Sequence, residues 1–342
     1  MSQTALDATP AWLRSLLGIG DAAEGDTVSL AGRDFVVRDG ILRDQRLLSD
    51  TQAQTGNVFG YKWNQRDSFG SPASRVQTRG WLDERYGDIE HAPWWSDYGE
   101  RPVVVDAGCG AALSAVELFR SRFEKINYLG VDVSNAIDVA LERLHAAGVQ
   151  PGLLQADITV VPIPAGSVDV IISEGVLHHT DSTEDALRSL VALLGDGGRI
   201  MFYVYRLKGP VREFTDDYLR ERLQAMTPDE AWSALMPLTK LGQALGDLGV
   251  EVEVPESIDL LDIPAGPIDV QRLFYWHVCK MFHHPELSID ELNHINFDWF
   301  APRNAHRQTE EQVRRWCEDL DLVIEREVIE NAGITVIARR SG

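Results

Sequence analysis

Cysteine is scarce in this chain, and the spacing of the few cysteines excludes the common metal and disulfide patterns. The sequence contains three, Cys109, Cys279 and Cys317. They lie far apart in the sequence, and no two of them form a C-x-x-C pair. We therefore expect free thiols in a reducing compartment and no metal site.

Positive charge is also scarce. Lysine and arginine number 32 against 53 acidic residues, which gives a formal net charge of −21, and only five of the basic residues are lysines. A surface of this charge repels phosphate backbones. We therefore expect no nucleic-acid partner and favour a small-molecule substrate.

Long apolar runs are missing as well. The first residues, MSQTALDATPAWLRSLLG, include acidic side chains and no uninterrupted apolar core of secretory length, and no later run approaches a membrane span. These absences predict a cytoplasmic protein without a membrane partner. The length of 342 residues allows one large core with a substantial insertion.

The strongest local pattern is VVVDAGCGAALSAVELF, residues 103–119. An apolar run ends at Asp106, Gly108 and Gly110 follow, and apolar residues then recur at helical spacing. This pattern predicts a strand, a glycine turn and a helix. Glycines let a ligand approach the backbone closely, and the free N–H groups of the helix face the same point. The stretch is either a cofactor loop or a plain tight connection in an α/β protein.

Acidic residues follow the next strands in the same way. The apolar run 126–131 ends at Asp132, a short run at 153–154 precedes Asp157, and a run at 168–172 leads into SEGVLHHT. A carboxylate after the second strand of such a unit is placed to accept ribose hydroxyls. Each acid could be a solvated loop residue, but acids along one sheet edge suit an adenosine better.

These segments resemble the class I S-adenosylmethionine-dependent methyltransferases. The matching motifs, in family order, are VVVDAGCG, YLGVDVS, LQADITVVPIPAGSVDVIISEGVLHHTDS and ALRSLVALLGDGGRIMFYV. They cover residues 101 to about 205, and the last 34 residues of the chain complete the resemblance. A dinucleotide-dependent dehydrogenase is disfavoured because Leu113 replaces the third glycine of G-x-G-x-x-G.

The resemblance implies an α/β fold, a doubly wound, seven-stranded Rossmann-like sheet with a C-terminal antiparallel hairpin, interrupted by a helical cap. The expected units are a small N-terminal helix and β module (1–54), an aromatic-rich helical lid (55–100), the cofactor-binding core (101–205 and 309–342) and a substrate-binding cap insertion (206–308).

The resemblance also implies S-adenosyl-L-methionine as the cofactor and places its contacts. The methionine part would lie at the glycine turn, the ribose at the end of the second strand and the adenine after the third. Glu174 would accept from the aminopropyl ammonium of the cofactor. The cofactor-binding set is Asp106, Gly108, Cys109, Gly110, Asp132, Val133, Asp157, Ile158 and Glu174.

The N-terminal module looks like the small β unit that binds zinc in some methyltransferases, but no cysteine precedes Cys109. We expect a degenerate remnant used for packing or dimerisation, which leaves a homodimer open. The following stretch is rich in aromatic residues, either as core packing or as a cofactor lid. In the lid interpretation Phe59, Tyr61 and Trp63 cover the cofactor, because aromatic faces attract the sulfonium cation and exclude water.

The insertion at 206–308 is far longer than an ordinary connection and must carry its own structure. Helix starts of the capping-box type are expected at Thr227 with Glu230 and at Ser288 with Glu291. In the core, a helix is expected from Ser182 through Leu194, with GDGG ending it before the strand IMFYVY.

Methyl transfer to a hydroxyl or ammonium needs a base, whereas transfer to a thioether does not. His178 and His179 follow the fourth strand at the carboxyl edge of the sheet, and they are the catalytic candidates. Their alternative role is packing of that turn.

Cations interleaved with aromatic residues mark the cap, although each arginine could equally form a surface ion pair. They suggest an anionic substrate, because a guanidinium offsets the desolvation of a carboxylate or phosphate. The substrate-binding candidates, with Arg272 first, are Arg206, Arg212, Arg272, Tyr275 and Arg303.

The sequence thus predicts a methyltransferase that methylates an oxygen or nitrogen of a small, anionic metabolite. Two alternatives stay open: a methyltransferase acting on the sulfur of a thioether or thiol, and a regulatory protein that binds the cofactor without catalysis.

Overall fold

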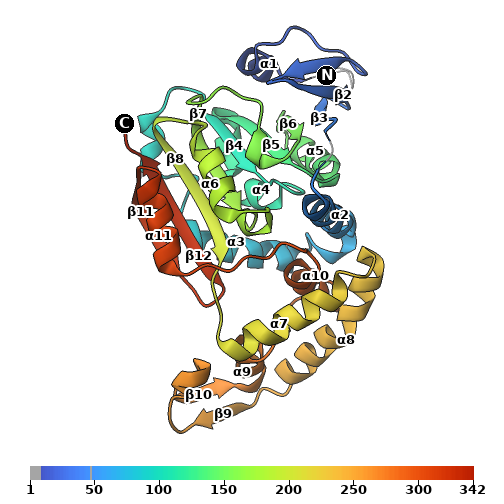
Figure 1. Cartoon of the computed structure of the whole chain (residues 1–342), viewed down its shortest axis with the longest axis vertical. Coiled ribbons are helices and arrows are strands. Elements are labelled where there is room, and N and C mark those ends of the chain that lie inside the picture. The colour runs from blue at the N-terminus through green and yellow to red at the C-terminus, as the bar shows by residue number, and fades with distance from the viewer. Residues whose placement is uncertain (1–8, 47) are drawn as a thin grey trace.

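A ten-stranded sheet forms the centre of the computed structural model, which describes residues 9–46 and 48–342 (Figure 1). The strand order is β1-β2-β3-β6-β5-β4-β7-β8-β12-β11. Seven of these strands form the expected sheet, which is thereby confirmed. They are β4 (Val103–Ala107), β5 (Asn127–Asp132), β6 (Gly152–Gln155), β7 (Val168–Glu174), β8 (Leu194–Tyr205), β11 (Leu322–Ile329) and β12 (Gly333–Arg340).

The direction of these strands places the site. β4 pairs in parallel with β5 on one side and with β7 on the other, so the chain order reverses at β4. β12 runs antiparallel to both β8 and β11, as expected of the terminal hairpin. In open sheets of this kind ligands bind outside the carboxyl ends of the strands, at the point of reversal. That edge is the one from which β8 leads into the cap (Figure 1).

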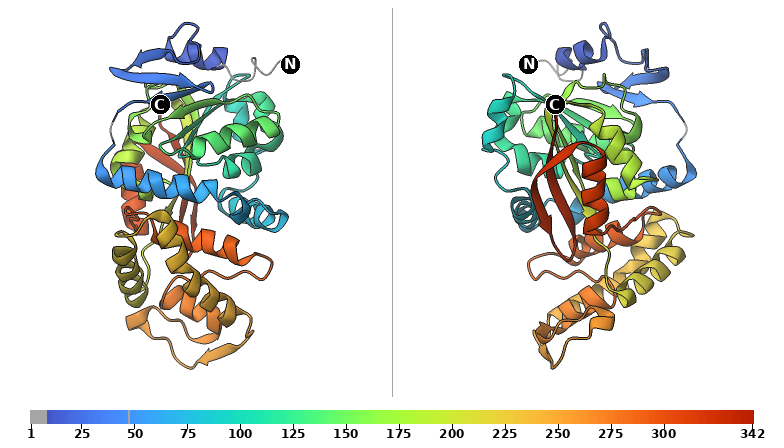
Figure 2. Two further views of the ribbon diagram at one scale, coloured as in Figure 1. Left: turned by 90° about the vertical axis from the view of Figure 1, so that its right-hand side faces the viewer. Right: turned by 60° about the vertical axis from the view of Figure 1, so that its left-hand side comes forward.

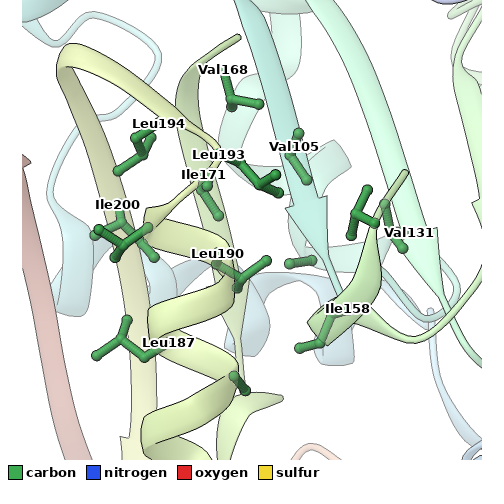
Figure 3. Close-up of a cluster of buried hydrophobic side chains, with 14 of the residues drawn as sticks. Val105, Val131, Ile158, Val168, Ile171, Leu187, Leu190, Leu193, Leu194 and Ile200 are labelled. Carbon is green, nitrogen blue, oxygen red and sulfur yellow. The ribbon is translucent and has the colours of Figure 1, made fainter. Parts of the chain in front are cut away.

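Helices cover both faces of the sheet and build its core. Leu187 and Leu190 of α6 lie against Ile171 of β7 and Ile200 of β8, and all four side chains are fully buried (Figure 3). Burial of each such side chain is worth about 1.5–3 kcal/mol. The helices next to the sheet are α4 (Leu113–Phe119), α5 (Ala136–Ala146), α6 (Thr183–Val191) and α11 (Glu310–Asp319).

The N-terminal module continues the sheet. It consists of α1 (Ala11–Leu17), β1 (Thr27–Leu30), β2 (Arg33–Arg38) and β3 (Ile41–Asp44). β3 pairs in parallel with β6. The two strands lie far apart in the sequence, so no local pattern predicts this pairing. Residues 1–8 of this expected module lie outside the described residues.

Two helices precede the core. α2 (Asp50–Asn64) and α3 (Pro72–Tyr86) occupy the segment expected as the lid. α2 begins before the expected position 55 because the Ser49 hydroxyl caps it by accepting from the backbone N–H of Gln52 at 3.1 Å. Within the part of the chain that the structure describes, no helix is both long and apolar enough to cross a membrane.

The cap lies at the end of the molecule opposite β1 and β2 (Figure 2). Both expected capping boxes, at Thr227 with Glu230 and at Ser288 with Glu291, are present. Its elements are α7 (Pro210–Leu223), α8 (Pro228–Gly246), β9 (Glu251–Val254), β10 (Gly266–Asp269), α9 (Val270–His277) and α10 (Ile289–Phe300).

The GDGG segment differs from expectation. α6 ends at Val191, three residues early, and the glycines lie inside β8, which already pairs Leu194 with Val168. A register shift follows between Val168 and Val170, so this is a bulged strand start. A Cβ on Gly198 would stand 3.0 Å from the carbonyl oxygen of Gly195, which explains this glycine without a helix end.

Candidate active site

A cavity of about 600 Å³ lies at the carboxyl edge of the sheet. Its wall is built from the glycine turn after β4, the ends of β5 and β7, the helices α2 and α3, and several segments of the cap. The volume is that of a small-molecule site. Cofactor candidates and cap residues therefore share one space.

The glycine turn needs its glycines. Gly108 has φ +86°, and a Cβ there would stand 2.3 Å from Cγ1 of Val176. Gly110 has φ +51°, and a Cβ there would stand 2.8 Å from Nε1 of Trp63. Both glycines line the cavity, so the backbone is open to a ligand on this side.

Asp132 holds the turn in shape and also lines the cavity. One carboxylate oxygen accepts from the backbone N–H of Gly110 at 2.8 Å, and the other accepts from the backbone N–H and hydroxyl of Ser134 at 2.8 and 2.6 Å. Burial raises the pKa of Asp132, while these hydrogen bonds oppose the rise. Its remaining lone pairs could receive ribose hydroxyls.

Asp106 and Cys109 lie beneath the turn, outside the cavity wall. The Tyr128 hydroxyl donates to Asp106 at 2.7 Å, and burial raises the pKa of Asp106 to about 7. The Cys109 thiol is buried in the core on the same side of the sheet. Their expected cofactor contacts would have to run through the backbone of the turn.

The expected adenine and ribose neighbours lie together. Val133, Asp157 and Ile158 all line the cavity near Asp132. The Asp157 carboxylate already accepts from the backbone N–H and the hydroxyl of Thr159, both at 2.8 Å. This fixes the turn after β6 and leaves its second oxygen for a ligand.

α2 brings one face over the glycine turn. Phe59, Lys62 and Trp63 line the cavity, whereas Tyr61 points away and donates to Asp229 at 3.0 Å. The Lys62 ammonium lies 4.3 Å from the centre of the Trp63 ring and pairs with Asp298. Helical spacing places residues 59, 62 and 63 on one face and residue 61 on another.

Glu174 lines the cavity but is already engaged. Arg85 forms an ion pair with it, and the Tyr86 hydroxyl donates to it. The guanidinium of Arg85 stacks 3.8 Å from the centre of the Tyr203 ring. Arg85 comes from α3, a segment with no motif, so the sequence analysis missed it. A contact from Glu174 to the cofactor ammonium stays a prediction.

The two histidines differ in their surroundings. His178 is fully buried, stacks 3.6 Å from the centre of the Tyr205 ring and lies outside the cavity wall. His179 lines the cavity, and its Nδ1 donates to the carbonyl of Asn304 at 2.6 Å. Burial lowers the pKa of His179 to about 4, so the ring is neutral and its unpartnered Nε2 is an acceptor.

Two of the arginine candidates lie away from the cavity. Arg206 pairs with Glu310 at 2.7 Å. Arg303 lies in a separate depression together with Arg307, and its backbone N–H donates to Gln54 at 2.8 Å. Neither residue lines the cavity.

The other three substrate-binding candidates line the cavity. Arg212 is 1% exposed, pairs with Asp216 at 2.5 Å and donates to the carbonyl of Tyr275. The guanidinium of Arg272 lies 5.5 Å from the centre of the Tyr275 ring and donates to the carbonyl of His283 at 3.3 Å. The structure therefore brings together Arg212, Arg272 and Tyr275.

Three lysines line the cavity, although the list of substrate-binding candidates contains none of them. The chain has five lysines, and Lys62, Lys208 and Lys280 line the cavity. Because lysine is rare in this acidic chain, each lysine could have been treated as a candidate for a specific role. All three cysteines are buried and free, and among the described residues no group of three His, Cys, Asp or Glu could hold a metal ion.

The comparisons with known proteins agree with this geometry. The family described as "Methyltransferase domain" matches residues 105–202, from within β4 to within β8. A tRNA (carboxymethyluridine(34)-5-O)-methyltransferase of Mus musculus is 29% identical over 168 residues, which is 45% of this chain and 23% of that protein. Ribosomal RNA small subunit methyltransferase C of Alcanivorax borkumensis is 29% identical, over 50% of this chain and 53% of that protein.

The chain thus spans 23% of the mouse relative and about half of the bacterial one. Among solved structures, magnesium protoporphyrin IX methyltransferase from Synechocystis PCC 6803 with bound S-adenosylmethionine has a TM-score of 0.44 and 14% identity, over 87% of this chain and all of that one. The matched family segment contains the glycine turn, Asp132 and Asp157. Residues 105–202 therefore match the methyltransferase domain family, within a class I sheet, and the cofactor is S-adenosylmethionine.

Proposed function

We propose that this chain transfers the methyl group of S-adenosylmethionine to an oxygen or nitrogen of a small, anionic metabolite. The observation that carries the proposal is the shared cavity. Gly110 and Asp132 form part of its wall, and Arg272 and Lys280 of the cap form another part. A cofactor at the glycine turn and an acceptor in the cap would then meet in one space, as in-line transfer requires.

Unpaired cations support an anionic acceptor. Lys208, Lys280 and Arg272 line the cavity, and within the described ranges each donates to backbone carbonyls without a carboxylate at ion-pair distance. A cation removed from water without a counter-ion is costly. A carboxylate or phosphate on the substrate would supply that counter-ion.

A small molecule fits better than RNA, although two relatives carry RNA in their names. Those matches cover half of this chain or less, and the family match ends at residue 202, before the cap begins. The net charge of −21 opposes binding of a phosphate backbone. The cap is the part that would choose the substrate.

His179 is the candidate base. Its Nδ1 donates to Asn304, which fixes the tautomer and leaves Nε2 buried without a hydrogen-bond partner in a residue that lines the cavity. This nitrogen could take the proton of a hydroxyl or ammonium acceptor. His178 lies outside the cavity wall and serves better as packing against Tyr205.

The two alternatives differ in what they need. A thioether acceptor has no proton to lose and needs no base, so replacing His179 with phenylalanine would leave that transfer intact. A regulatory protein would bind S-adenosylmethionine but transfer no methyl group.

The proposal is tested with methyl-labelled S-adenosylmethionine. The protein is incubated with a small-molecule extract and, separately, with total RNA, with the Asp132→Ala variant as the control for cofactor-dependent labelling. We expect label in an acidic, low-molecular-weight fraction. Label in RNA alone would overturn the substrate class, and label in neither would favour the regulatory protein.

A further inference from the structure

Four cations gather around one indole ring in the cap. Trp299 of α10 is 3% exposed, and its ring centre lies 5.3 Å from Lys208 Nζ and 5.2 Å from Lys280 Nζ. The guanidinium carbons of Arg212 and Arg220 lie at 5.3 and 4.7 Å. These residues come from α7 and from the segments that follow β8 and α9. The fold thus concentrates positive charge at one point of an acidic protein.

One buried carboxylate organises this cluster. Asp216 accepts from Nε of Arg212 at 2.5 Å, from Nε1 of Trp299 at 2.7 Å and from the backbone N–H of Lys280 at 3.2 Å. The Asp216 carboxylate therefore already has its donors, and it holds Arg212 and the indole in place. Arg220 has its own partner, Asp217, at 2.8 Å.

The two lysine ammoniums keep unused donors. Lys208 donates to the carbonyls of Arg206 and Ala332 at 2.5 and 2.8 Å, and Lys280 donates to the carbonyl of Ile295 at 2.8 Å. An ammonium has three donors, so at least one remains on Lys208 and two remain on Lys280. Both residues and Arg212 line the cavity.

Burial disfavours the charged form of both Lys208 and Lys280. Lys280 is 7% exposed, and burial lowers its pKa to about 7. Burial, together with the nearby Arg212 and Lys280, lowers the pKa of Lys208 well below its usual value. An anion placed among these groups would remove the repulsion and restore both charges.

We propose that Lys208, Lys280 and Arg212, arranged around Trp299, form a binding subsite for a carboxylate or phosphate group of the acceptor. The planar guanidinium and the two ammoniums supply donors from different directions, and the indole closes the subsite against water. That the bound molecule is the methyl acceptor rests on the proposed function, whereas the binding of an anion does not.

The test is calorimetric titration of the protein saturated with S-adenosylhomocysteine, using inorganic sulfate as a surrogate for phosphate in one arm and acetate as the carboxylate in the other. We expect Lys208→Met and Lys280→Met to weaken binding of the preferred anion by roughly tenfold or more, the scale for a lost charged hydrogen bond. The matched control is Lys240→Met, an exposed lysine of α8.

The two arms identify the chemistry. Tighter sulfate binding indicates a phosphate, and tighter acetate binding indicates a carboxylate. Lys280→Gln, which can keep the hydrogen bond to Ile295, replaces the methionine variant if that one fails to fold. Binding of neither anion by the wild type, or equal binding by the wild type and the lysine variants, would overturn the subsite.

A pH profile separates binding from packing. Sulfate keeps its charge, so its affinity for the wild type should fall as pH rises above about 7, where Lys280 loses its proton. Lys280→Arg should flatten the profile, because a guanidinium stays charged. The charged groups that face Lys280 are Lys62, Lys208, Arg212, Asp216 and Asp298.

The outcomes also separate the two proposals. Anion binding that depends on Lys208 and Lys280, without any methyl transfer, would leave the subsite standing and the proposed function wrong. If methyl transfer to an acidic metabolite continues unchanged when both lysines are replaced, the proposed function stands and the subsite is wrong. Affinity for S-adenosylhomocysteine, measured in every variant, reports whether the cofactor side remains folded.

Discussion

Asp132 has two roles that one substitution removes together. Its carboxylate lines the cavity, and it also holds Gly110 and Ser134 in the turn. We expect Asp132→Ala to weaken S-adenosylmethionine binding by about 1.5–3 kcal/mol, the scale for a lost charged acceptor. Calorimetry measures this. Unchanged affinity in a folded variant would mean that the ribose contact lies elsewhere.

Arg272 is the arginine on which substrate charge can be tested most simply. It lines the cavity, and among the described residues it has no carboxylate partner, so its removal breaks no ion pair. Arg272→Met and Arg272→Lys should reduce turnover sharply and leave cofactor affinity intact, because neither restores a planar fork.

Steady-state kinetics with an identified acceptor, paired with calorimetry for the cofactor, give both quantities. A methyl ester of that acceptor should also be a poor substrate. Wild-type turnover by Arg272→Met, or equal rates for acid and ester, would remove Arg272 from the substrate site.

At the scale of one element, α2 offers a test of whether Trp63 covers the cofactor or only packs in the core. Trp63 stands against Gly110 and also packs edge-on against Phe69 at 5.0 Å. We expect Trp63→Ala to weaken cofactor binding by about 0.5–2 kcal/mol beyond any loss of stability, because an aromatic face that attracts the sulfonium is lost.

Cofactor titration and thermal unfolding of the same variant separate the two effects. Tyr61→Phe is the control from the same helix, since Tyr61 faces Asp229 instead of the cavity. If Trp63→Ala lowers the melting temperature while the folded protein binds cofactor normally, the residue serves packing alone.

Element boundaries show where sequence patterns suffice. The capping boxes at Thr227 and Ser288 and the strand, turn and helix around Gly108 were predictable, because each signal lies within a few residues. The GDGG segment was not, since a glycine can serve a helix end or a strand bulge, and only the pairing of β8 with β7 decides.

At the scale of the whole molecule, contacts between distant segments account for what the sequence left unseen. β3 joins β6 across more than a hundred residues, and Lys62 of α2 reaches Asp298 of α10. The cavity is assembled in the same way, with Arg85, Lys208 and Lys280 from three unrelated segments. Arg85 lies in no motif, whereas Lys208 and Lys280 belong to the stretches of interleaved cations and aromatic residues in the cap.

The division into units follows from the same contacts and stays a proposal. The core holds the family segment, while α2, α3 and the cap close the cavity over its edge. The N-terminal strands lie at the far end of the sheet from the cap (Figure 2). Use of this module for dimerisation, and the homodimer itself, remain predictions.

The central claim is that one cavity holds the cofactor at the glycine turn and the acceptor beneath the cap. A crystal structure of the protein with S-adenosylhomocysteine tests it most directly. The account predicts ribose hydroxyls on Asp132, adenine beside Ile158, and the sulfur directed into open space between His179 and the residues Lys208, Lys280 and Arg272. An adenosyl group bound away from Gly110, or a sulfur directed away from the cap, would contradict it.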